Sequence, residues 1–389
     1  MELMRTYSYK IDVKKSDLVD AEGKEGWLAS MVRTHWRLYN DALEYKKHCY
    51  EKHKDAKGKP LSVSKFDLFA WMAKRRETHP YMRNLNSHSL RSTLTRLDLA
   101  YQAFFRRVKA GTENPGFPKF KSLRDWDTIA YQTGGWRVDG HWLVITKCGD
   151  SPERRLRIRL HRPLPEDRRT MMLTRKADGW HMLVQCAVSY EPIADRTEHP
   201  PVGIDVGIKS LVVTSDGEEI SKVGAYRKAQ AALRRAQRKL SRSPKPLPGQ
   251  KSSNNRRDAI ARVAKLHQRV ANVRKDAAHK AARTLVDNHA IVAHEALNIK
   301  GLAKSALALD VNDAAWGQLL GQIKSKAEEV GTEVIPVDPR NTSQDCSGCG
   351  TRVEKTLATR VHKCPSCGLV LDRDQNAARN ILARAMASR

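Results

Sequence analysis

Long apolar runs are missing from this chain of 389 residues, and none approaches the ~18 apolar residues that mark a membrane-spanning helix. Residues 1–15 alternate polar and apolar side chains, so they lack the apolar core of a secretion signal. We therefore expect a chain with no membrane partner that works in the cytoplasm.

Acidic residues are also scarce: 71 Lys and Arg stand against 43 Asp and Glu, which gives a formal net charge of +28 and a pI near 10. Such an excess destabilises the compact state through self-repulsion, and a polyanionic partner relieves it. Nucleic acid is the partner that this charge favours. A merely basic protein, or one attracted to anionic lipid, is the alternative.

Cysteine is sparse, and four of the seven residues form two close pairs near the C-terminus. The pairs are Cys346-Ser-Gly-Cys349 and Cys364-Pro-Ser-Cys367, each followed by glycine, with fourteen residues between them. This spacing lets four thiolates reach one tetrahedral ion, and a reducing compartment disfavours disulfides. The pattern predicts a structural zinc site, because four protein ligands leave no open position for catalysis.

The N-terminal half alternates between strand and helix patterns. Residues 7–13 predict a strand, and apolar spacings of three and four predict helices at 26–43, 66–76 and 90–105. Prolines within 114–119 end the helical region, and strands are predicted at 142–146, 156–160, 171–175 and 180–188. We expect a small antiparallel β-barrel with an inserted helical bundle.

The C-terminal half has the pattern of a mixed α/β domain. A strand at 202–208 and a hairpin precede residues 222–285, where nineteen Lys or Arg accompany two acidic residues. Two basic helices are predicted there, on either side of a break at 241–255. A strand at 291–294, a helix at 316–330, a strand at 332–337 and a helix at 376–386 complete the order.

Three acidic residues of this half follow or adjoin apolar strands: Asp205, Glu295 and Asp374. A carboxylate in such a place needs a cation partner. Two divalent ions bridged by these oxygens would activate water for phosphodiester hydrolysis. Taken singly, each acid also fits a helix cap, a turn or an ion pair, and Asp374 in particular fits a cap of the last helix.

Four segments together resemble the TnpB family, the RNA-guided DNA endonucleases of insertion-sequence transposons. They are Gly203-Ile-Asp205-Val-Gly-Ile, Val292-Ala-His-Glu295-Ala-Leu-Asn, Asn341-Thr-Ser-Gln-Asp-Cys346-Ser-Gly-Cys349-Gly and Asp372-Arg-Asp374-Gln-Asn376-Ala-Ala-Arg-Asn-Ile. The resemblance covers the C-terminal half, while upstream it rests on Asn114–Lys121 and the order of segments. The family is related to compact type V CRISPR effectors.

The resemblance implies a ribonuclease H-like (RuvC) mixed α/β domain with an inserted zinc ribbon, within an α+β multidomain chain. It makes Asp205, Glu295 and Asp374 the catalytic acids, which hold two Mg²⁺, and prefers Asp374 over Asp372. The implied domains are a β-barrel wedge domain at 1–19 and 108–199, a helical recognition domain at 20–107, the nuclease domain at 200–342 and 371–389, and the ribbon at 343–370.

The implied partners are a guide RNA from the transposon end and double-stranded target DNA beside a short duplex motif. We expect a monomer, in a prokaryotic cytoplasm and on the nucleoid when bound to DNA. The basic residues expected to contact nucleic acid are Lys119, Lys121, Arg234, Arg235, Arg238 and Lys239. Among aromatic residues, Phe120, Tyr131, Trp136 and Trp142 suit base stacking, although a core role is favoured for most of them.

Three other functions remain open. A DDE-type transposase is disfavoured because its acids run Asp, Asp, Glu along the chain, and here the order is Asp, Glu, Asp. A compact type V CRISPR effector shares the same core, so genomic context would distinguish it. A guided DNA binder that represses without cleavage would leave DNA uncut in the presence of metal.

Overall fold

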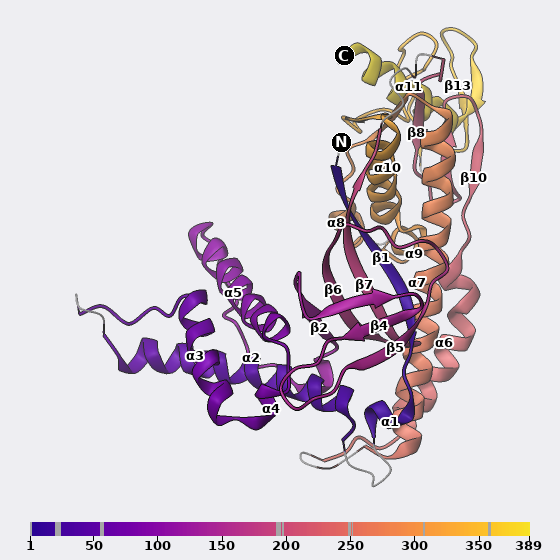
Figure 1. Ribbon diagram of the computed structural model, residues 1–389. Helices are drawn as coiled ribbons and strands as arrows, with labels where there is room; N and C mark the ends of the chain where they lie inside the picture. The colour runs from indigo at the N-terminus through magenta and orange to yellow at the C-terminus, as the bar shows by residue number, and fades with distance from the viewer. Residues whose placement is uncertain are drawn as a thin grey trace. The chain divides into compact units, whose positions relative to one another are not determined.

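The computed structural model describes residues 2–19, 25–54, 58–191, 196, 198–247, 250, 252–305, 308–356 and 359–389. The chain divides into two compact units, residues 2–189 and 190–389 (Figure 1). Each unit has a hydrophobic core of its own. The predicted break at 241–255 lies partly outside the described residues, at 248–249 and 251.

The N-terminal unit is built on one antiparallel sheet of seven strands in the order β2-β6-β7-β1-β5-β4-β3. The first strand of the chain lies inside the sheet, where Tyr9 pairs with Met182 of β7 and Ile11 pairs with Ile158 of β5. The strands are β1 Glu2–Asp12, β2 Thr128–Tyr131, β3 Trp136–Asp139, β4 Trp142–Ile145, β5 Arg154–Arg159, β6 Arg168–Lys176 and β7 Gly179–Ser189.

This sheet is a curled half-barrel, so the prediction of a small antiparallel barrel holds for the strands and their curl, although the sheet stays open. β2 and β3 lie at opposite edges, and the described residues form no ladder between them. These strands follow each other in the chain with only residues 132–135 between, which requires the sheet to curl. Each has four residues, so an edge ladder would add few hydrogen bonds.

Helices of the N-terminal unit pack on the sheet through an apolar face. Leu28 and Leu43 of α2 and Leu94 of α5 are fully buried, as the predicted spacing requires. Ser64 and Asp67 form a capping box that starts α3. The helices are α1 Lys15–Leu18, α2 Trp27–Lys52, α3 Lys65–Thr78, α4 Pro80–Arg83 and α5 Ser87–Lys109, with a 3-10 turn at Leu123–Asp125.

The C-terminal unit contains a five-stranded mixed sheet in the order β10-β9-β8-β11-β12. β11 runs parallel to both β8 and β12, and β9 runs antiparallel to β8 and β10. The strands are β8 Val202–Asp205, β9 Ser210–Thr214, β10 Glu219–Ser221, β11 Ile291–Glu295 and β12 Glu333–Val337. The helices are α6 Ala225–Arg242, α7 Asn254–Asn288, α8 Ile299–Leu302, α9 Ala308–Ala314, α10 Trp316–Val330 and α11 Arg373–Ala387.

α6 and the first half of α7 form a helical hairpin that lies away from β8 and α11 (Figure 1). Leu233 and Val270 are buried in a small core between the two helices. Asp313 of α9 holds the base of this hairpin, because it accepts from the backbone N–H of Tyr226 at 2.8 Å and from Arg274 at 2.9 Å. Although α7 has 35 residues, no helix in the described part of the chain is long and apolar enough to cross a bilayer.

Gly203 allows α11 to lie directly against β8. A Cβ at this position would stand 2.1 Å from the carbonyl oxygen of Ala378. We predict that Gly203→Ala destabilises the protein by roughly 1–3 kcal/mol, because the helix backbone must move. Thermal or denaturant unfolding measures this change.

The matched control is Gly321→Ala in α10, where a Cβ meets nothing within 4 Å. That variant should be stabilised by up to about 1 kcal/mol, because alanine favours a helix interior over glycine. Equal stability of the Gly203→Ala variant and the unmodified chain would show that the close approach imposes no constraint.

Candidate active site and metal centre

Asp205 and Glu295 end adjacent parallel strands. Ile204 of β8 pairs with His294 of β11, so the next residues, Asp205 and Glu295, lie side by side at the carboxyl ends of the strands. The Thr342 hydroxyl, which is 1% exposed, donates a hydrogen bond to Glu295. This bond fixes one carboxylate oxygen of Glu295.

Asp374 lies in the first turn of α11, which packs against β8, β9 and β11. The cap of α11 is Asp372, whose carboxylate accepts from the backbone N–H of Asp374 at 2.8 Å and of Gln375 at 3.3 Å. The side chain of Asp374 is therefore not used as the cap. It is buried, and it pairs with Arg373 at 2.9 Å.

The three acids influence one another electrostatically. Burial, followed by the negative charges of Glu295 and Asp374, raises the pKa of Asp205 to about 8. Burial also raises the pKa of Glu295, although the hydrogen bond from Thr342 opposes that rise. A divalent cation beside these carboxylates would reverse both effects, so the acids fit a metal site.

The three acids do not form a compact ligand set among the described residues. In the described part of the chain, the four cysteines are the one group of three or more His, Cys, Asp or Glu whose ligand atoms all lie within 4.8 Å of one another.

The four cysteine sulfurs form a compact set. Sγ of Cys346 lies 3.6 Å from that of Cys367, and Sγ of Cys349 lies 3.5 Å from that of Cys364. Gly350 and Gly368 have φ of +76° and +75°, which confirms the need for glycine after each pair. Hydrogen bonds with the side chain and backbone of Thr351 lower the pKa of Cys349 to about 6, whereas hydrogen bonds among the sulfurs raise the pKa of Cys367.

Asparagines of α11 connect the cysteine segment to the acids, a role that sequence reasoning missed. Asn376 is fully buried, accepts from the Ser347 backbone N–H at 3.0 Å and donates to the Asp345 carbonyl at 2.8 Å. Asn380 donates to the carbonyls of Thr342 and Asp345. The signal was present, because two asparagines four residues apart share one helix face just after Asp374.

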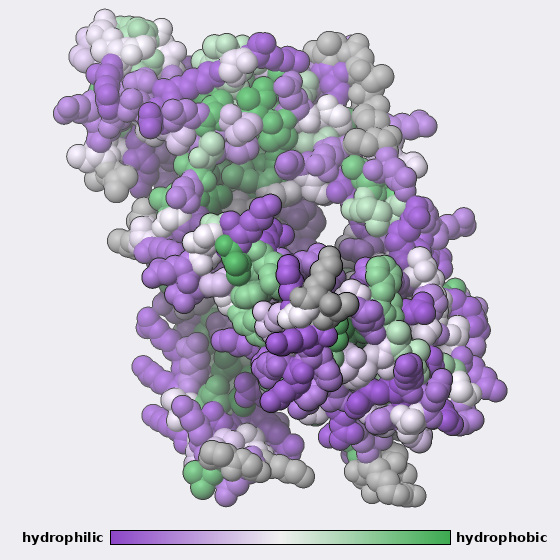
Figure 2. Space-filling model, turned by 90° about the vertical axis from the view of Figure 1, so that its left-hand side faces the viewer, coloured by the Kyte–Doolittle hydropathy of each residue, from purple (hydrophilic) through white to green (hydrophobic). Residues whose placement is uncertain are grey.

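All six predicted nucleic-acid contacts are exposed, and nothing in the structure tests their contacts. The backbone of Lys121 is fixed by hydrogen bonds with the side chain of Asn40. Figure 2 shows hydrophilic residues over most of one face of the molecule, with smaller apolar patches between them. The six predicted contact residues, all exposed, are Lys119, Lys121, Arg234, Arg235, Arg238 and Lys239.

The aromatic residues divide between core and surface. Tyr131 is 1% exposed, and its hydroxyl donates to the Met31 sulfur, so its side chain belongs to the core. Phe120 is 53% exposed and Trp142 is 39% exposed. Stacking on bases therefore remains open to Phe120 and Trp142.

Two family models match the C-terminal half. The model described as "Probable transposase" matches residues 185–306, and the model described as "Cas12f1-like, TNB domain" matches residues 316–381. The first match contains Asp205 and Glu295, and the second contains the four cysteines and Asp374.

Curated relatives match most of the chain. A Streptomyces pristinaespiralis protein named "Putative RNA-guided DNA endonuclease" is 33% identical over 90% of this chain and 83% of its own length. InsQ of Escherichia coli, with the same description, is 29% identical over 79% of this chain and 76% of its own length. The chain belongs to the TnpB family of RNA-guided DNA endonucleases.

Solved structures confirm the multidomain α/β architecture. A Cas12f1 chain in a complex with guide RNA and target DNA has a TM-score of 0.59 at 16% identity, covering 91% of this chain and 82% of that chain. The RNA-guided endonuclease CRISPR-Cas_phi3 has a TM-score of 0.50 at 10% identity, covering 99% of this chain and 92% of that chain. At such identities, the likeness concerns the fold alone.

Proposed function

We propose that this protein is an RNA-guided DNA endonuclease that hydrolyses phosphodiester bonds with two Mg²⁺ held by Asp205, Glu295 and Asp374. The placement of Asp205 and Glu295 side by side at the carboxyl ends of β8 and β11 carries the proposal. The charge of Asp374 acts on Asp205 as well, because with burial and Glu295 it raises the pKa of Asp205. The strand order β10-β9-β8-β11-β12, with its last three strands parallel, supports a ribonuclease H-like (RuvC) core.

Bound Mg²⁺ supplies an activated water and stabilises the leaving oxygen. Neighbouring residues position the acids that would hold the ions. Thr342 orients Glu295, and the cap at Asp372 fixes the first turn of α11, which carries Asp374. Arg373 holds the Asp374 carboxylate through Nε at 3.0 Å and Nη2 at 2.9 Å. Its guanidinium adds positive charge next to the third acid, where a phosphate would be attracted.

We propose that the four cysteines hold one zinc ion in a ribbon at 343–370 and that the ion is structural. Cys346 and Cys364 are buried, and the other two sulfurs complete a four-thiolate set. The other proposed domains keep the boundaries 1–19 and 108–199, 20–107, and 200–342 with 371–389.

The proposed partners are a guide RNA and a double-stranded DNA target. The relatives are named putative RNA-guided DNA endonucleases, and the net charge of +28 suits a nucleic-acid partner. A Cas12f1 from Sulfoacidibacillus thermotolerans is 29% identical over 46% of this chain, which keeps a CRISPR effector as a second candidate. A repeat array or a neighbouring transposase in the genome distinguishes the two.

The decisive test is to purify the chain with its bound nucleic acid and sequence that nucleic acid. We expect one RNA species, and we expect the protein to cut a duplex that matches the guide portion of this RNA when Mg²⁺ is present. Absence of RNA from the purified protein, or an uncut matched duplex, would contradict the proposal.

The α6–α7 hairpin is proposed as the main grip on nucleic acid. Replacing Arg234, Arg235, Arg238 and Lys239 together with Glu should weaken RNA binding strongly. It should also flatten the salt dependence of binding, because a protein that contacts fewer phosphates releases fewer counterions when it binds. Binding measured at several salt concentrations gives the slope.

The control variant replaces four exposed lysines of the same unit with Glu. Its net charge therefore changes by the same amount as that of the α6 variant. Its salt slope should stay close to that of the unmodified chain, because we propose no phosphate contacts there. A slope equal to the unmodified value in the α6 variant would show that this helix face is merely solvated. The control residues are Lys300, Lys304, Lys324 and Lys363.

A further inference from the structure

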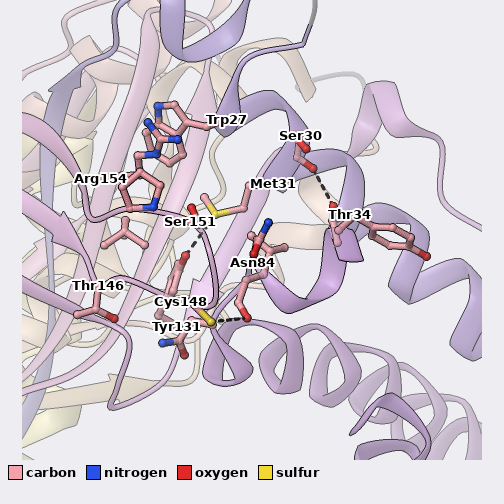
Figure 3. A pocket seen from close by; sticks show the side chains of 15 residues that line it. Trp27, Ser30, Met31, Thr34, Asn84, Tyr131, Thr146, Cys148, Ser151 and Arg154 are labelled. Atoms are coloured by element: carbon pink, nitrogen blue, oxygen red, sulfur yellow. Dashed lines mark hydrogen bonds between the residues drawn. The ribbon is translucent and has the colours of Figure 1, made fainter. Parts of the chain in front are cut away.

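A pocket of about 200 Å³ lies within the N-terminal unit, where α2, the turn before α5 and the end of β4 meet (Figure 3). Trp27 and Met31 of α2, Asn84 of the turn, and Cys148 and Arg154 beyond β4 are among its lining residues. All lining residues lie between positions 27 and 154, so the pocket contains none of the proposed catalytic acids. None of the proposed functions of the chain uses it.

Arg154 lines this pocket and forms no ion pair with the residues that the structure describes. Its Nε is buried and has no hydrogen-bond partner among the described residues. Its guanidinium carbon lies 5.7 Å from the centroid of the Trp27 ring. The guanidinium carries the positive charge of the side chain, and a ligand that offers an acceptor would complement it.

Trp27 is held in place, and this gives the pocket a fixed flat wall. Its Nε1–H donates to Asp17 at 2.8 Å, which fixes the orientation of the indole. The guanidinium of Arg154 is a second flat group beside it (Figure 3). Unpaired bases of RNA stack on aromatic rings and on arginine planes of this kind.

Asn84 offers a further donor. Its Oδ1 accepts from the backbone N–H of Asp150 at 3.1 Å, and its NH₂ group donates to no acceptor in the described part of the chain. In the same way, Oδ1 of Asn86 accepts from the backbone N–H of His88 at 2.9 Å. The pocket therefore combines flat walls with donors that lack acceptors, and carbonyl oxygens complement such donors.

We propose that this pocket binds one unpaired uracil base of the RNA that the protein carries. The base would stack beside Trp27 and Arg154, and its two carbonyl oxygens would accept from the NH₂ group of Asn84 and from the terminal NH₂ groups of the Arg154 guanidinium. The volume admits a single planar base and excludes a duplex. Arg83 and Lys147, exposed neighbours of Asn84 and Cys148 in the chain, supply positive charge for the adjoining phosphates. The proposal rests on the proposed function, which supplies the RNA.

Cys148 provides a direct test, because it lines the pocket and is partly exposed while Cys49 and Cys186 are buried. The full chain is treated with iodoacetamide, both with its co-purified RNA and after ribonuclease digestion, and alkylation of Cys148 is followed by mass spectrometry. Bound RNA should slow this alkylation roughly tenfold, as a largely occupied site requires. Oligouridylate added to the digested protein should restore the protection, and oligoadenylate should not.

Two variants distinguish recognition of the base by Asn84 from a general protection of Cys148 by RNA bound elsewhere. Asn84→Asp keeps the acceptor for Asp150 but replaces the free donor with a charged oxygen, so RNA should no longer protect Cys148. Asn114→Asp makes the same change at an exposed position outside the pocket, and protection should persist. Both variants should retain their co-purified RNA, because the proposed grip on the α6–α7 hairpin is untouched.

Several results would overturn the assignment. Equal alkylation with and without bound RNA would show that no base occupies the pocket, while the proposed function would stand. Protection by oligothymidylate equal to that by oligouridylate would overturn the assignment to RNA. If the protein carries no RNA and binds no oligonucleotide, the proposed function fails, and the pocket proposal fails with it.

Discussion

Loss of DNA cleavage with retained nucleic-acid binding is the expected result of replacing Asp205, Glu295 or Asp374 with its neutral amide. Each change removes a negative ligand from the proposed Mg²⁺ site while the shape of the side chain is preserved. Groups that act as one catalytic unit are not additive, so double and triple variants should lose no more than single ones. Cleavage of a labelled duplex matched to the guide, beside a binding assay, measures both properties.

Asp372→Asn is the matched control for Asp374→Asn, because Asp372 is exposed and serves as the cap of α11. Asparagine is also a good cap, so both stability and cleavage should change little. Normal cleavage by the Asp374 variant together with loss of cleavage by the Asp372 variant would reverse the assignment of the third acid. Normal cleavage by all three amide variants would reject the nuclease site.

The same site makes metal-free stability depend on pH. Because the pKa of Asp205 is raised to about 8 in the folded protein, the folded state binds more protons than the unfolded state from about pH 4 to pH 8. The free energy of unfolding therefore falls as pH rises through this window. Asp205→Asn should raise the melting temperature in a chelator at pH 9 and change it little at pH 4. An equal effect at both pH values would contradict the raised pKa.

Loss of zinc and loosening of the C-terminal segment is the expected result of Cys364→Ser. A four-thiolate site of this kind contributes about 10–16 kcal/mol of binding free energy in zinc-finger peptides, so folding of the ribbon should depend on the ion. About one zinc per chain should be lost, as measured by metal analysis. Limited proteolysis should then cut between 343 and 370.

Cleavage should fall in this variant as well. Asn376 and Asn380 hold the 342–347 segment against α11, and Thr342 in that segment orients Glu295. A disordered ribbon therefore removes support from two of the three acids. Cys148→Ser is the control, because this cysteine lies outside the ribbon and should leave zinc content unchanged. Full zinc content in the Cys364 variant would contradict the four-cysteine site.

Local patterns in the sequence were enough to predict most elements and a set of four cysteines within reach of one ion. Helix α10 was predicted with its observed bounds, and β11 was predicted to end at Glu295, because apolar periodicity depends on near neighbours. The paired cysteines lie close together in the chain, so their meeting needs little tertiary information. β2 and β3 were missed, because their four residues each give too little alternation, whereas β4 is equally short but is a continuous apolar run.

Tertiary structure decided what depends on residues far apart in the chain. The sheet of the N-terminal unit is curled but open. A sheet closes into a barrel only if its two edge strands pair, and the local sequence pattern does not specify that pairing. Both Asp372 and Asp374 fit the start of a helix, and only the folded chain shows Asp372 as the cap and Asp374 buried beside Arg373. The pocket at Arg154 likewise exists only in the fold, because its walls come from segments more than 100 positions apart.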